Sequence, residues 1–127
     1  MQHYPSILII DDDHDLRFLL GQLLDHAGFT IFEAANGQEA LAVLEVKSPS
    51  ILLIDLDMPV MNGKDLVLHL ENDPSANQKW GKIPRVIYSA RVDLYSEIFP
   101  LVDASIEKPV NHEKLIETIR ITLKKRG

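Results

Sequence analysis

The chain has 127 residues, 46% of them hydrophobic and 25% charged, which predicts one globular domain over residues 1–127 with its own hydrophobic core. The net charge of −6 argues against direct binding to nucleic acid, and the absence of cysteine excludes disulfides and thiolate metal sites. The first five residues lack the pattern of a signal peptide, and no apolar run approaches the roughly 18 residues that span a membrane. We therefore expect a cytoplasmic protein without a membrane segment.

The first half of the chain alternates short strands with helices. Strands are predicted at Ser6–Ile10, Phe29–Ala34 and Ile51–Asp55. The first and third are almost wholly aliphatic, which is typical of strands buried on both faces of a parallel sheet. Between the strands, apolar residues at helical spacing predict a helix that ends at Gly28, and Asn36 is placed to cap a second helix that reaches about Val46.

The second half continues the alternation. Leu66, Val67 and Leu70 share one face of a predicted third helix, whereas the mostly polar segment 75–82 is typical of a loop. The remaining predicted elements are a strand at Arg85–Tyr88, a short helical stretch over Leu94–Leu101 interrupted by Pro100, a strand at Ala104–Glu107 and a final helix capped by Asn111.

Five strands alternating with five helices predict right-handed crossovers and a parallel sheet covered by helices on both faces. We expect a doubly wound α/β fold of (βα)5 type with the flavodoxin-like strand order 2-1-3-4-5. This order places the first and third strands side by side. Residues that follow these two strands should therefore meet at one edge of the sheet.

Acidic residues stand at those two strand ends. Asp11 and Asp12 follow the first strand, and Asp55 ends the third. Three carboxylates close together repel one another unless a cation lies between them, and oxygen ligands without nearby histidine or cysteine favour Mg²⁺. Taken separately, Asp55 could cap a turn, and the first acids could stabilise the start of a helix.

Ser89 and Lys108 follow the fourth and fifth strands, so they should lie at the same edge. The edge then carries acids for a metal ion, a central aspartate, a hydroxyl and an ammonium group. This set meets the needs of phosphoryl transfer to a carboxylate, because the metal and the lysine neutralise the phosphoryl oxygens and the hydroxyl donates a hydrogen bond.

These residues, in this order, resemble the response-regulator receiver family of two-component signalling over essentially the whole chain. The resemblance is carried by Asp11-Asp12, by Asp55 with Met58-Pro59 and Gly63 downstream, by Ser89-Ala90 and by Lys108-Pro109. It implies that Asp55 accepts a phosphoryl group from the phosphohistidine of a sensor histidine kinase or phosphotransfer protein.

The resemblance also implies a ligand set and a switch. Mg²⁺ would be bound by Asp12, Asp55 and the backbone carbonyl of Asp57, with Asp11 helping through water. Ser89, Ala90 and Lys108 would bind the phosphoryl group and report its presence to a downstream effector or to a second copy of the domain. Such a protein is a signalling phosphoacceptor, and its only chemistry is its own phosphotransfer and dephosphorylation.

The chain departs from the family at Ser105, where a tyrosine or phenylalanine usually stands three residues before the conserved lysine. A serine has no ring to bury as Ser89 moves. We therefore expect the signal to pass through the loop after Ser89 and the short helix with Pro100. We expect Tyr95 and Phe99 in this helix, together with Ile121 on the last helix, to form an apolar patch for a partner or a second copy of the domain.

Two further expectations concern Asp57. In this family the residues two positions beyond the acceptor and the switch hydroxyl look out over the phosphoryl group, so we expect Asp57 and Arg91 to form an ion pair across the mouth of the site. Asp55-Leu56-Asp57 also resembles the first motif of haloacid-dehalogenase-type phosphatases, with Asp55 as nucleophile and Asp57 as acid–base.

A pseudo-receiver that binds partners without phosphate is a second alternative.

Overall fold

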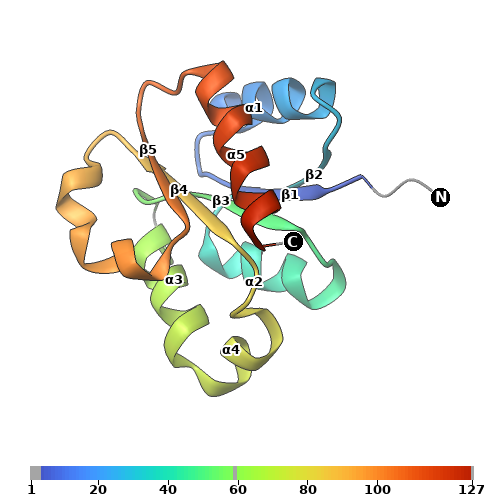
Figure 1. The fold of residues 1–127 in the computed structure, drawn as a ribbon. Helices are drawn as coiled ribbons and strands as arrows, with labels where there is room; N and C mark the ends of the chain where they lie inside the picture. Colours follow the sequence, from blue (N-terminus) through green and yellow to red (C-terminus); the bar gives the residue numbers. More distant parts are fainter. Residues whose placement is uncertain (1–3, 59, 127) are drawn as a thin grey trace.

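The computed structural model describes residues 4–58 and 60–126 and contains one five-stranded parallel sheet (Figure 1). The strands are β1 (Ser6–Ile10), β2 (Thr30–Ala34), β3 (Ile51–Asp55), β4 (Arg85–Ser89) and β5 (Ala104–Glu107). Their order across the sheet is β2-β1-β3-β4-β5. The predicted doubly wound α/β fold with strand order 2-1-3-4-5 is confirmed.

Helices cover both faces of this sheet (Figure 1). They are α1 (His14–His26), α2 (Gly37–Val46), α3 (Gly63–Asn72), α4 (Pro74–Trp80), the 3-10 segment η1 (Val92–Leu101) and α5 (His112–Arg126). No helix in the described part of the chain is both long and apolar enough to cross a membrane. Pro59, which belongs to the motif after Asp55, lies outside the described residues.

The aliphatic strands divide their side chains between two cores. Along β1, Ile7 and Ile9 pack with residues of α1 and α5, whereas Leu8 and Ile10 pack with residues of α2 and α3. All four side chains are fully buried. This alternation explains why the strand is aliphatic from Ile7 to Ile10, since neither face of the sheet meets solvent there.

The prediction of a loop over 75–82 is wrong, because this segment contains α4. The Asp73 side chain caps the helix by accepting a hydrogen bond from the Ala76 amide at 2.9 Å, and Pro74 occupies the first turn, where its missing N–H is not needed. Ala76 is buried and Trp80 packs against the core. The few apolar residues therefore suffice to hold a helix that is polar on its outer side.

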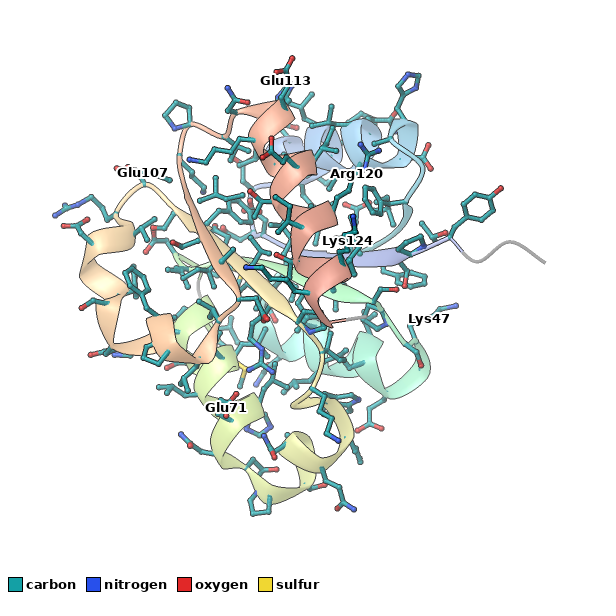
Figure 2. The ribbon with its side chains drawn as sticks, in the orientation of Figure 1. Lys47, Glu71, Glu107, Glu113, Arg120 and Lys124 are labelled. Carbon is teal, nitrogen blue, oxygen red and sulfur yellow. The ribbon has the colours of Figure 1, made fainter. Side chains whose placement is uncertain are left out.

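Arg85 anchors α4 to the sheet. This arginine begins β4 and is only 1% exposed. Its guanidinium donates to the Gly81 carbonyl at 2.7 Å and to Glu71 Oε1 at 3.3 Å. Glu71, labelled in Figure 2, comes from α3. The buried charge thus has partners on the helix before α4 and at the end of α4.

The helical stretch after β4 also differs from the prediction. It begins at Val92 instead of Leu94, and it is a 3-10 helix with Pro100 inside. Tyr95 has non-helical dihedral angles, with φ −117° and ψ 25°. Proline lacks an N–H and cannot extend a regular α-helix. The segment is therefore a tight, kinked connection, which brings the Tyr95 side chain to the site described below.

Candidate phosphorylation site

Asp11, Asp12 and Asp55 lie together at the carboxyl edge of the sheet. β1 and β3 are parallel neighbours with Ile10 opposite Ile54, so the residues that follow meet at one edge. One carboxylate oxygen from each acid lies within 4.8 Å of those of the other two. Asp11 and Asp55 are buried, whereas Asp12 is exposed. The prediction that these three acids meet is confirmed.

Asp55 is the acid at the centre of the group. Its Oδ1 accepts a hydrogen bond from the Asp57 amide at 3.3 Å and lies 3.3 Å from the Nζ of Lys108. Burial, and then the charge of Asp11, raise the pKa of the Asp55 carboxyl to about 7, against the opposing effect of Lys108. Without a cation, the site therefore holds more negative charge than one lysine can balance.

Lys108 reaches Asp55 from the end of β5. Its backbone N–H donates to the Ser89 carbonyl at 2.9 Å, which continues the pairing of β4 with β5. The peptide bond to Pro109 is cis. The Nζ of Lys108 lies 5.1 Å from the centre of the Tyr88 ring. The lysine is thus placed between an aromatic ring and the central aspartate.

Ser89 is engaged with the residue two positions after Asp55. This serine is fully buried, and its Oγ donates to Asp57 Oδ2 at 2.9 Å. The Arg91 amide in turn donates to Ser89 Oγ at 3.0 Å. In this structure the hydroxyl therefore points to Asp57, and it has to leave that carboxylate before it can bind a group on Asp55.

The predicted ion pair of Asp57 with Arg91 is wrong. The Arg91 Nε lies 3.8 Å from Asp93, and the second oxygen of Asp57 accepts a short hydrogen bond from the Tyr95 hydroxyl. This bond raises the pKa of Tyr95 to about 12, because an ionised phenol would face a carboxylate. Two hydroxyl donors satisfy Asp57 instead of a guanidinium.

The expected apolar patch lacks one of its three predicted residues, Tyr95. Phe99 is 38% exposed and Ile121 is 46% exposed. Tyr95, in contrast, is half-buried, packs against the core and donates its hydrogen bond to Asp57. Tyr95 thus belongs to the site and not to an outer patch. Ser105 lies exposed on β5, so no ring stands at that position.

Tyr88 is a second site residue, besides Tyr95, whose role the sequence analysis missed. Its side chain is buried, and its hydroxyl donates to Asp11 Oδ2 at 2.5 Å. Burial and the charge of Asp11 raise the pKa of Tyr88 above its usual range, so the phenol remains a proton donor. The signal in the sequence was a tyrosine among aliphatic residues at the end of a buried strand, where a hydroxyl needs a partner.

The donor set fits a hard divalent ion. Three carboxylate oxygens converge, and no histidine or cysteine lies among them. The exposed Asp12 leaves room for the waters that Mg²⁺ retains. The residues present therefore match the chemistry of a metal site with oxygen ligands.

Comparison with known proteins identifies the family. The family model described as the response regulator receiver domain matches residues 7–120. The transcriptional regulatory protein CpxR of Klebsiella pneumoniae is 34% identical over 123 residues, covering 94% of this chain and 50% of CpxR. The phosphate regulon transcriptional regulatory protein PhoB of Pseudomonas aeruginosa is 29% identical over 125 residues, covering 96% of this chain and 53% of PhoB. The chain thus spans about half the length of these two relatives.

A solved structure agrees with these sequence matches. The crystal structure of a CheY-like response regulator receiver domain protein from Methanospirillum hungatei has a TM-score of 0.85 at 28% identity, covering 98% of this chain and 97% of that one. The match decides against the phosphatase alternative, because both sequence and fold follow the receiver. This chain belongs to the response regulator receiver domain family of two-component signalling.

Proposed function

We propose that Asp55 accepts a phosphoryl group from the phosphohistidine of a sensor histidine kinase or a phosphotransfer protein. The observation that carries this proposal is the position of Asp55, buried between Asp11 and the ammonium of Lys108 at the end of the central strand. The membership of the receiver family supports it as well.

In the proposed step, a carboxylate oxygen of Asp55 forms a bond to phosphorus. The bond between phosphorus and the imidazole nitrogen of the donor breaks, and its electron pair stays on that nitrogen. The product is a mixed anhydride of the carboxylate, and the freed imidazole nitrogen takes up a proton from solvent, so that the donor histidine leaves as neutral imidazole. Lys108, 3.3 Å from Asp55 Oδ1, faces the oxygens on which negative charge gathers.

Mg²⁺ would supply charge neutralisation at the phosphoryl oxygens. The residues proposed to hold it are Asp12, Asp55 and the backbone carbonyl of Asp57, with Asp11 acting through water. Asp11 is fixed by hydrogen bonds to both of its oxygens, which suits a residue that orients a water and does not move. Repulsion among the acids in the absence of the ion supports the same assignment.

After transfer, Ser89, Ala90 and Lys108 are proposed to bind the phosphoryl group. Ser89 would exchange its hydrogen bond to Asp57 for one to a phosphoryl oxygen. Of its two hydroxyl donors, the Asp57 carboxylate would then keep only Tyr95. The loss of the Ser89 hydrogen bond would thus be felt in η1, which carries Tyr95. This route replaces the missing ring at Ser105 with a tyrosine from another element.

The proposed setting follows from the family. The domain would act in the cytoplasm as a phosphoacceptor and not as an enzyme on other substrates, with slow loss of its own phosphoryl group to water. Its surface would then bind a downstream effector protein or domain, or a second copy of itself.

Intact-mass measurement after incubation with acetyl phosphate and Mg²⁺ tests the proposal. We expect one added phosphoryl group that requires Mg²⁺ and is absent from Asp55→Asn. Asp25→Asn, which changes an exposed aspartate on α1, is the matched control and should be phosphorylated like the wild type. A wild-type chain that gains no mass would be a pseudo-receiver, and an adduct that persists in Asp55→Asn would exclude Asp55 as the acceptor.

A further inference from the structure

Tyr88 connects two parts of the site that come from different strands. It lies in β4 and is 1% exposed. Its hydroxyl donates to Asp11 Oδ2 at 2.5 Å, and its ring lies beneath the Lys108 ammonium, 5.1 Å from the centroid. One side chain thus contacts an acid at the end of β1 and the lysine after β5.

The hydrogen bond from Tyr88 completes the restraint of Asp11. The other carboxylate oxygen, Oδ1, accepts from the Asp13 amide at 2.9 Å. The Asp11 backbone carbonyl accepts from Arg17 at 2.5 Å. With both oxygens engaged by donors, the carboxylate plane cannot rotate freely. Its orientation toward Asp55 and Asp12 is therefore set by protein groups before any ion arrives.

The ring of Tyr88 acts on a different partner. A lysine ammonium over an aromatic face is attracted by the ring, and this attraction is stronger when both groups are partly removed from water. Lys108 has an exposed fraction of 25% for its side chain, and the Tyr88 ring is buried. The buried ring thus attracts the Lys108 ammonium and helps to keep its Nζ near Asp55.

We propose that Tyr88 is a positioning residue of the phosphorylation site, whose hydroxyl orients Asp11 for the metal ion and whose ring holds Lys108 toward Asp55. The proposal rests on the proposed function, because it assumes that Mg²⁺ and a phosphoryl group bind at this edge. The two roles are separable, since Tyr88→Phe removes only the hydroxyl and Tyr88→Leu removes the ring as well.

The hydroxyl role predicts weaker metal binding. Loss of a partner that orients a metal-binding group typically lowers metal affinity by about 10- to 100-fold. Asp11 acts through water in the proposed ligand set, so we expect the lower end, about tenfold, in Tyr88→Phe. At saturating Mg²⁺ the phosphorylation rate of Tyr88→Phe should approach the wild-type rate, because the ring still supports Lys108. Tyr88→Leu should remain slower at saturating Mg²⁺.

Titration of the isotopically labelled chain with MgCl₂, followed by amide chemical shifts, measures the Mg²⁺ affinity independently of the phosphorylation rate. The variants are wild type, Tyr88→Phe, Asp11→Asn and the double variant. If the hydroxyl acts through Asp11, its removal should matter little in the Asp11→Asn background. Tyr4→Phe removes a hydroxyl from a residue that is 63% exposed before β1, at the opposite edge of the sheet, and is the matched control.

The ring role has its own spectroscopic readout, which does not depend on whether Tyr88→Leu folds. The ε-methylene protons of Lys108 should show an upfield ring-current shift in wild type and in Tyr88→Phe. Absence of that shift, or a wild-type rate in folded Tyr88→Leu at saturating Mg²⁺, overturns the ring role.

The outcomes separate this inference from the function on which it rests. A weaker Mg²⁺ affinity in Tyr88→Phe that is lost in the Asp11→Asn background supports the hydroxyl role. An equal or tighter affinity in Tyr88→Phe, with wild type binding Mg²⁺ normally, overturns that role and leaves the proposed function intact. Failure of the wild type to bind Mg²⁺ overturns both.

Discussion

The close contact between α3 and the end of β3 predicts that the protein is less stable when Gly63 carries a side chain. This glycine begins α3, and a Cβ at its position would lie 2.4 Å from the Asp55 carbonyl oxygen and 2.8 Å from Leu56 Cα. Both are backbone atoms, which cannot turn aside as a flexible side chain can. In Gly63→Ala, either the start of α3 or the end of β3 therefore has to move.

The expected cost follows from that displacement. Overpacking in a close-packed interior lowers the free energy of unfolding by about 1–3 kcal/mol, and we expect Gly63→Ala to lie at the upper end because two backbone contacts are violated. Movement of β3 would also shift Asp55, so Mg²⁺ affinity and phosphorylation by acetyl phosphate should fall together. Urea denaturation followed by circular dichroism measures the free energy of unfolding.

Gly21→Ala is the matched control. Gly21 is buried inside α1, but an added Cβ would lie 3.6 Å from Ile31 Cγ2 and 4.0 Å from Ile9 Cδ1, which are ordinary contacts. Alanine is preferred over glycine within a helix by about 1 kcal/mol, so this variant should be as stable as the wild type or more stable. A Gly63→Ala protein as stable as Gly21→Ala would refute the close packing of α3 on the strand that carries Asp55.

Two further predictions concern Asp55 and Tyr95. In metal-free protein, Asp55→Asn should raise the free energy of unfolding above pH 7 by up to about 4 kcal/mol, because the folded chain raises the pKa of the Asp55 carboxyl to about 7 from 3.8. The gain should shrink as the pH falls through 7 and disappear as the pH falls below 3.8, where the wild-type carboxyl becomes protonated in both the folded and the unfolded state. Urea denaturation in the presence of a chelator measures this gain, and a gain that does not change with pH would contradict the raised pKa of Asp55. Beryllium fluoride, a phosphoryl mimic, should change the amide chemical shifts of residues 92–101 in the wild type. The changes should be smaller in Tyr95→Phe, because the Tyr95 hydroxyl joins η1 to Asp57. Equal changes in both proteins would exclude a signal through this hydrogen bond.

The sheet and the acids could be predicted from the sequence because the evidence for them is local. Aliphatic runs such as Ile51–Ile54 identify buried strands, and the residue after each run marks a strand end. The strand order of a doubly wound fold then brings Asp11 and Asp55 together. α4 was missed because the polar composition of 75–82 outweighed the cap and proline at Asp73-Pro74, which are also a local signal.

The two tyrosines of the site could not be predicted in this way. Tyr88 and Asp11 are separated by 77 positions, and Tyr95 and Asp57 by 38, so each contact depends on how whole elements pack. The same holds for Arg91, whose opposite charge suggested a pair with Asp57. Arg91 lies near Asp93, which is close in sequence, whereas Asp57 is satisfied by hydroxyl donors.

The central claim is that the phosphoryl group is attached to Asp55. Reduction of the acyl phosphate with borohydride converts the phosphorylated aspartate to homoserine, and peptide mapping by mass spectrometry then locates it. After incubation with acetyl phosphate and Mg²⁺, we expect homoserine at position 55, with Asp11 and Asp12 unchanged. Homoserine at either of those two acids, with Asp55 unmodified, would contradict the account.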